Sequence, residues 1–249
     1  YEMGGGLLPR IPLPLPPPAS HWHSVFAVHA ILIALLTAAT FIDFDEQTIP
    51  DLITFPGTIL LLMVTTIWPQ SHLPAIFVGV PQPGMIDVQS LQLTGKPLEQ
   101  WPAMFYGTPG LVMALAIVWA WCVAILPGTL TMRHGAWKAA QFYIASLFRH
   151  GRWWKYGLVF FVISLAVAAV WASGGAHWRA LLTSLAGLAF AGGLVWGVRI
   201  GGSVGLQQEA MGFGDVTLMC MIGACLGWQP SLMVFFLAPF AALVIGGLA

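Results

Sequence analysis

Long apolar runs with almost no charge inside them constrain this chain more than any other feature. About 20 mostly apolar residues suffice to cross a bilayer as a helix, and seven runs approach or reach that length. They cover residues 25–42, 52–68, 105–126, 156–171, 180–198, 216–228 and 232–248. Of the 249 residues, 58% are hydrophobic and only 7% are charged, against about 25% charged in soluble domains. The sequence therefore predicts an all-α, polytopic transmembrane helix bundle of about seven spans.

The basic residues predict an orientation for these spans. Five of the nine Lys and Arg residues lie in one predicted loop, 127–155. Because cytoplasmic loops carry an excess of Lys and Arg, we expect this loop in the cytoplasm. Alternating the spans then places loops 43–51 and 201–215 on the same side. The loop 69–104 falls outside.

Composition also limits domain organisation and partners. Residues 1–20 form a Pro-rich segment, which is typical of an extended tether rather than a folded element. We expect residues 21–249 to form the membrane-embedded domain. The net charge of zero argues against a nucleic acid partner, whereas the lipid bilayer is an expected one. No HExxH motif and no CxxC pair is present, so we expect neither a metal site nor a cofactor.

The acidic residues are concentrated in two short segments that border predicted spans. Six of the nine lie in FIDFDEQTIPD and EAMGFGD. The first segment carries Asp43, Asp45, Glu46 and Asp51, and the second carries Glu209 and Asp215. Asp43 ends one apolar run, and Asp215 begins another. Ionisable groups at such depth cost a few kcal/mol and mark functional sites by default.

Two carboxylates brought together in a poorly hydrated site would share a proton, because desolvation and mutual repulsion raise the pKa of one of them. One member can then act as general base on a water molecule, while the other donates to the carbonyl under attack. Such a pair hydrolyses a peptide bond without a metal, a thiol or a serine. Asp43 and Asp215 are the candidates for this role.

The residues around the two aspartates suggest supporting roles. Gly212 and Gly214 let another backbone approach closely, and Pro50 interrupts helical pairing near Asp43. The other four acids are either solvated loop charges or an acidic vestibule that attracts a basic peptide. On the second interpretation the substrate-binding candidates are Asp45, Glu46, Pro50, Asp51, Glu209, Gly212 and Gly214.

Both segments resemble the motifs of the type IV prepilin peptidases, a GxGD family of membrane aspartic proteases. Asp43, Pro50 and Asp51 match the first motif, an Asp followed after six residues by Pro and then Asp or Asn. GFGDVTL followed by MCMIGACLGW is similar to the second, GxGDxKL with a small-residue helix and Gly-Trp. The resemblance implies that Asp43 and Asp215 are catalytic. It further implies a multi-pass bacterial inner-membrane enzyme that removes the leader of pilin-like precursors at the cytoplasmic face, as in type IV pilus and type II secretion systems.

The chain departs from the family pattern in three respects. Thr217 stands where the family has Lys. The Cys-rich N-terminal cytoplasmic domain of larger members is not found in this sequence, which therefore gives no support for N-methylation. The two motifs are also separated by far more residues than is usual, which we interpret as an insertion at about 69–200. These departures leave open a non-catalytic alternative, either a transporter or an inactive relative that assists pilus or secretion assembly.

Overall fold

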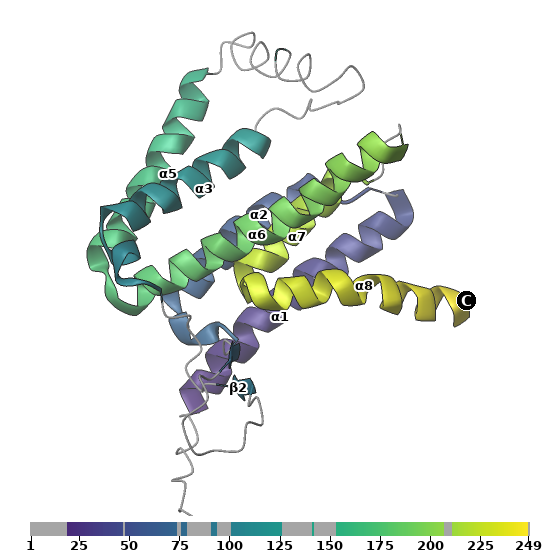
Figure 1. Cartoon of the computed structure of the whole chain (residues 1–249), viewed down its shortest axis with the longest axis horizontal. Coiled ribbons are helices and arrows are strands. Elements are labelled where there is room, and N and C mark those ends of the chain that lie inside the picture. The colour runs from purple at the N-terminus through teal and green to yellow at the C-terminus, as the bar shows by residue number, and fades with distance from the viewer. Residues whose placement is uncertain are drawn as a thin grey trace, which may run out of the picture.

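The computed structural model describes residues 19–46, 48–73, 76–78, 91–93, 101–125, 141, 153–206 and 211–248. Seven α-helices dominate these residues (Figure 1). They are α1 (Ala19–Glu46), α2 (Asp51–Ile67), α3 (Thr108–Ile125), α5 (Trp153–Ser173), α6 (Gly175–Leu206), α7 (Phe213–Leu226) and α8 (Trp228–Leu248). Two short 3₁₀ helices, η1 (Pro69–Ser71) and η2 (Ala103–Tyr106), precede α3 in the chain.

Each of the seven predicted apolar runs falls largely within one of these helices, so the all-α prediction is confirmed for the described residues. Whether the seven helices cross a membrane stays a prediction. Most of the Pro-rich segment, residues 1–18, lies outside the described residues, as does the basic loop from 127 to 152 apart from residue 141. The division of the chain at residue 20 therefore also stays a prediction.

Two of the predicted loops contain regular secondary structure. In the loop 69–104, strands β1 (Ile76–Val78) and β2 (Leu91–Leu93) pair antiparallel, with Phe77 opposite Gln92. The expected loop 201–215 is helical through Leu206, because α6 continues across the glycines that follow Ile200. Glycine costs a helix interior about 1 kcal/mol per residue relative to alanine, which weakens a helix without forbidding it.

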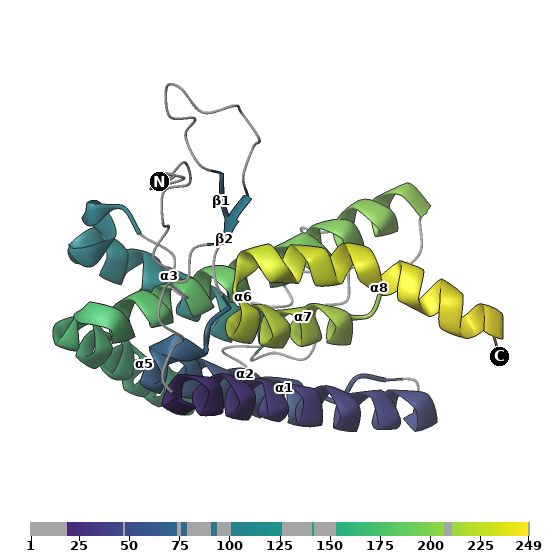
Figure 2. The same cartoon turned by 90° about the horizontal axis from the view of Figure 1, so that it is seen from below.

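Helix α6 is the centre of the bundle and packs against α2, α3, α5, α7 and α8. Its tightest neighbour is α7, which Figures 1 and 2 both show running alongside it. A Cβ atom on Gly187 would collide with the carbonyl oxygen of Gly223, and the reverse holds for a Cβ on Gly223. Small residues at these two positions thus let the helix backbones touch, which fixes where α7 begins relative to α6.

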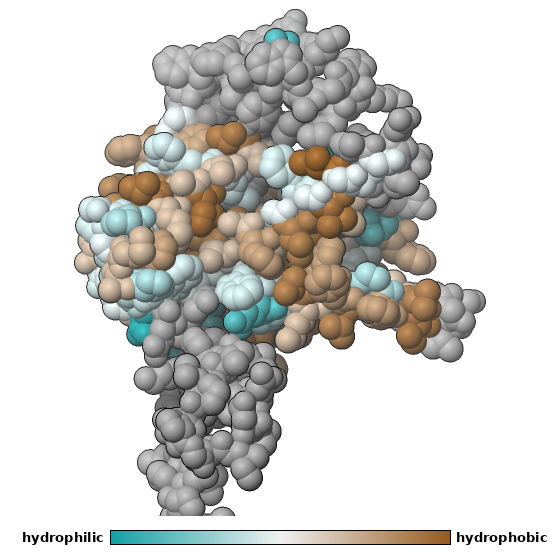
Figure 3. Space-filling model, viewed as in Figure 1, coloured by the Kyte–Doolittle hydropathy of each residue, from teal (hydrophilic) through white to brown (hydrophobic). Residues whose placement is uncertain are grey.

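The outer surface of the bundle is strongly apolar. Hydrophobic residues cover much of the described surface in Figure 3, including part of α8. Exposed large side chains on α8 include Met233, Phe236, Leu237, Phe240 and Leu243. By length and composition, 23–46 and 175–203 are sufficient to cross a membrane, and five further apolar helices among the described residues are shorter.

Candidate active site

The two acidic segments meet at one end of the bundle. Helix α1 ends at Glu46, α2 begins at Asp51, and α7 begins at Phe213. In Figure 1 these ends lie on the right-hand side of the molecule, where α6 also ends. We call this region the acidic end. Helices α1, α2 and α7 contact one another, so segments far apart in the sequence share one small region of the fold.

The direct contact between the two motifs lies at Gly214. An ideal Cβ on this residue would stand 2.7 Å from Cβ of Ile49 and 3.2 Å from its carbonyl oxygen. Any side chain here would therefore push the second motif away from the first. The next residue, Pro50, is the N-cap of α2, and its carbonyl oxygen accepts hydrogen bonds from the N–H groups of Ile53 and Thr54 at 3.0 and 3.2 Å. Pro50 thus ends the segment between α1 and α2, and it starts α2 beside the loop that carries Gly212 and precedes α7.

Asp215 lies in the first turn of α7, partly buried, one residue before the predicted span. Burial raises the pKa of its carboxyl group. A hydrogen bond from the backbone N–H of Gly212 opposes this by lowering the pKa, and the nearby charge of Asp43 raises it again. Asp215 therefore holds a proton to higher pH than a solvated aspartate does.

The other predicted acidic residues are exposed where the structure describes them. Asp43, Asp45 and Glu46 are exposed in the last turn of α1. Asp51 is exposed in the first turn of α2, and loss of part of its hydration raises its pKa. Glu209 lies outside the described residues. The described acids therefore form a largely solvent-facing group beside the half-buried Asp215, and their roles stay predictions.

The structure assigns specific contacts to two residues beside the loop that precedes Asp215. Thr217, the departure from the family lysine, is buried, and its hydroxyl donates to the carbonyl oxygen of Gly214 at 2.9 Å. Arg199 of α6 is also buried and reaches the loop before α7. The sequence did carry a signal for Arg199, since it is a lone cation near the end of an apolar run.

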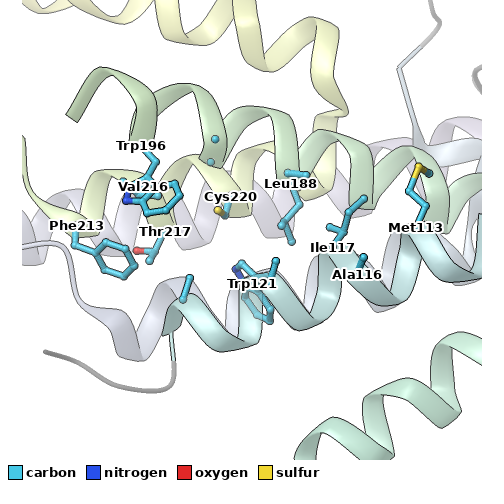
Figure 4. Close-up of a pocket in the computed structure, with 15 residues that line it drawn as sticks. Met113, Ala116, Ile117, Trp121, Leu188, Trp196, Phe213, Val216, Thr217 and Cys220 are labelled. Atoms are coloured by element: carbon cyan, nitrogen blue, oxygen red, sulfur yellow. The ribbon is translucent and has the colours of Figure 1, made fainter. Parts of the chain in front are cut away.

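An apolar cavity adjoins the acidic end. It encloses about 450 Å³ between α3, α6 and α7. Figure 4 shows Phe213, Val216 and Thr217 at one end of the cavity, with Trp121 and Leu188 farther along. The residues on either side of Asp215 in the chain thus help to line the cavity. Its walls include Gly192 and Gly193, which carry no side chain, and Ala116, Ala120, Ala124 and Ala189.

Candidate metal ligands do not cluster in the described part of the chain. No group of three or more His, Cys, Asp or Glu side chains that could hold an ion occurs there. The three cysteines are free and buried, and each lies in a helix rather than beside the acids. The described titratable groups at the acidic end are carboxyls together with Arg199.

Comparison with known proteins gives one match. Residues 151–247 match the sequence model of the type IV leader peptidase family, which confirms the family resemblance over this part of the chain. The matched region includes the GFGD motif with Asp215, and it begins inside the stretch 69–200 that we interpreted as an insertion. It does not include Asp43 or Pro50. No curated protein and no solved structure matches the chain.

Proposed function

We propose that this protein is an aspartic endopeptidase that removes the leader of pilin-like precursors, with Asp43 and Asp215 as its catalytic pair. The observation that carries the proposal is the packing of Gly214 against Ile49. This contact holds the family-matched motif against a segment that the family match does not cover. The charge of Asp43 raises the pKa of Asp215, which supports assigning the two carboxyls to one site.

The environments of the two carboxyls support different roles in hydrolysis. Asp215 is half-buried with a raised pKa, so it is the member that keeps the proton and donates it to the carbonyl oxygen of the scissile peptide. Asp43 is exposed and, as a carboxylate, takes a proton from the attacking water. The water oxygen bonds to the carbonyl carbon. The C–N bond then breaks as the hydroxyl formed from the carbonyl oxygen returns its proton to Asp215, and the amine leaves with a proton from Asp43.

The surroundings of the pair support a substrate with a basic leader and an apolar continuation. Asp45, Glu46 and Asp51 are exposed around the site, and they would attract a positively charged leader. The apolar cavity beside Asp215 would take an apolar part of the substrate. Glu209 belongs to the same proposal on sequence grounds.

The exposed apolar side chains support a location in a membrane, here the bacterial inner membrane. A surface like that of α8 is stable in lipid and would aggregate in water. The acidic end would face the cytoplasm, as the basic loop 127–155 predicts. The spans need not be of equal length, because several of the described helices are shorter than a bilayer's hydrocarbon core requires.

The second candidate function is that of a non-catalytic relative, and Thr217 is the observation in its favour. Its buried hydroxyl is turned back to the carbonyl of Gly214, so this position supplies no cation to the site. Thr217→Lys tests the alternative. If the native chain is inactive and Thr217→Lys gains leader cleavage, the loss of the lysine accounts for an inactive relative.

The proposal is tested by following leader removal from a pilin precursor in membranes. Asp43→Asn and Asp215→Asn change one carboxyl to an amide of the same shape, and each should reduce kcat by about 10²–10⁴-fold. Asp45→Asn is the matched control, since it makes the same change two residues away and should alter KM rather than kcat. Full activity in either catalytic variant, with the protein folded, would show that the pair is wrongly assigned.

A further inference from the structure

Arg199 is a buried cation that the proposed reaction does not use. It lies near the end of α6 and is 8% exposed. A cation in such an apolar surrounding is costly and is retained where its contacts have a use. The contacts of Arg199 are all the more informative because they reach out of α6 to the loop that precedes α7.

Two contacts of different kinds join Arg199 to this loop. Its Nε donates a hydrogen bond to the carbonyl oxygen of Met211 at 3.0 Å. Its guanidinium carbon lies 5.7 Å from the centre of the Phe213 ring. An arginine can donate through the edge of its plane while its cation interacts with an aromatic ring, and a lysine ammonium cannot reproduce both contacts at once.

The residue between these two contacts is the one that binds Asp215. Gly212 is the N-cap of α7, and its backbone N–H donates to the Asp215 carboxyl. Arg199 thus holds the residue before Gly212 and the residue after it. The Met211 carbonyl and the Gly212 N–H belong to the same planar peptide, so rotation of that peptide would carry the N–H away from the carboxyl.

We propose that Arg199 is a positioning residue, which fixes Met211 and Phe213 so that the Gly212 N–H is held against Asp215. The inference rests on the proposed function and adds to it a residue that touches no reacting atom. It acts on catalysis only through the geometry of the loop. Asp43 remains the described charge that acts directly on Asp215.

Loss of the Arg199 contacts should change the pKa of Asp215 in a definite direction. The Gly212 hydrogen bond favours the ionised form of Asp215, so weakening it raises the pKa of Asp215. The acid then stays protonated to higher pH, and the basic limb of the kcat–pH profile moves upward. A residue that only supported folding would lower the amount of active enzyme and leave the profile in place.

The experiment compares Arg199→Gln and Arg199→Lys with Arg179→Gln, a matched change in the same helix at its far end. The substrate is a labelled precursor with a basic leader and an apolar segment, in detergent micelles. We expect Arg199→Gln to lower kcat by about 10- to 100-fold, with little change in KM and an upward shift of the basic limb. Arg199→Lys should recover little of this loss, and Arg179→Gln should match wild type. Full recovery by Arg199→Lys would overturn the proposal, because charge alone would then suffice.

A second readout keeps the inference separate from the proposed activity. The titration of Asp215 is followed by ¹³C NMR of aspartate-labelled protein, with the signal assigned by its loss in Asp215→Asn. We expect Asp215 to titrate at higher pH in Arg199→Gln whether or not any precursor is cut. If wild type fails to cleave, the proposed function fails while this shift still supports the positioning role. An unshifted titration refutes that role. Should Arg199→Gln not fold, Phe213→Leu removes the ring contact alone and should shift the titration in the same direction.

Discussion

The two ends of helix α2 use polar residues in opposite ways. At its beginning, the acidic end gathers exposed or half-buried carboxyls around the contact between Gly214 and Ile49. At its other end, buried Thr65 and Ser184 share a hydrogen bond of 2.9 Å, and Ser184 also lies 3.0 Å from Nε2 of His72. We call Thr65, His72 and Ser184 the hydroxyl cluster. One end leaves ionisable groups accessible, and the other pairs its polar atoms away from solvent.

This difference suggests that the acidic end carries the reaction and that the hydroxyl cluster stabilises the fold. A buried polar group that is fully paired rigidifies the fold, and the hydroxyl cluster ties the end of α2 to α6 and to the segment after η1. Nearby, Trp178 and Trp101 add hydrogen bonds to the Phe105 carbonyl and to Thr183. With α2 fixed there, Ile49, which lies just before the helix, is held in place to pack on Gly214.

The largest effect that we expect from this comparison concerns His72 and acid stability. Burial, opposed by a hydrogen bond to Pro69 and aided by the charge of His29, lowers the pKa of His72 to about 4. The unfolded chain, with a histidine pKa near 6.5, binds this proton first as the pH falls. Stability should therefore drop between about pH 6.5 and pH 4, by up to about 3 kcal/mol.

Thermal unfolding in detergent across this pH range measures that drop. His72→Gln can still bond to Ser184 but does not titrate, so its stability should depend less on pH than that of wild type. His177→Gln, an exposed histidine on α6, is the control and should keep the wild-type dependence. If stability depends equally on pH in wild type and in His72→Gln, His72 is not the cause of the acid instability.

Gly214→Ala should break the acidic end without affecting the hydroxyl cluster. The new Cβ would meet Ile49 at 2.7 Å, so the two motifs must separate. A displacement of about 1 Å can cost about 100-fold in rate, or about 2.7 kcal/mol of transition-state stabilisation. Leader cleavage measures the effect. Gly197→Ala is the matched control, because nothing lies near its Cβ, and its activity should equal that of wild type.

Ser184→Ala should have a smaller effect than Gly214→Ala, and it should lower stability rather than activity. It leaves the buried Nε2 of His72 without its hydroxyl partner, whereas Thr65 keeps its bond to the Leu61 carbonyl. One unsatisfied buried group costs about 1–3 kcal/mol, which should lower the melting temperature. The kcat of the folded fraction should be unchanged. Ser173→Ala, an exposed serine bonded only to its own helix, should melt like wild type. A large fall in kcat for Ser184→Ala would contradict the proposal that the hydroxyl cluster affects stability alone.

Several features could be predicted from the sequence because they depend on local properties. The apolar runs located all seven described helices, since a helix in an apolar setting needs only its own residues to satisfy its backbone. The acidic segments and the GFGD motif gave the candidate aspartates, and residues 151–247 match the expected family. Helix ends were less accurate, as at Leu206, because glycine lowers helix stability without deciding where a helix stops.

What only the tertiary structure decided is which residues touch across the chain. No periodicity shows that Ile49 packs on Gly214, that Arg199 holds the loop around Gly212, or that Thr217 turns back to a backbone carbonyl. The pairing of His72 with Ser184 and the burial that lowers the pKa of His72 were equally hidden. Hydrophobicity acts on each segment separately and without direction. Close contacts and shifted ionisation instead depend on how helices pack, and here the small residues along α6 and α7 set that packing.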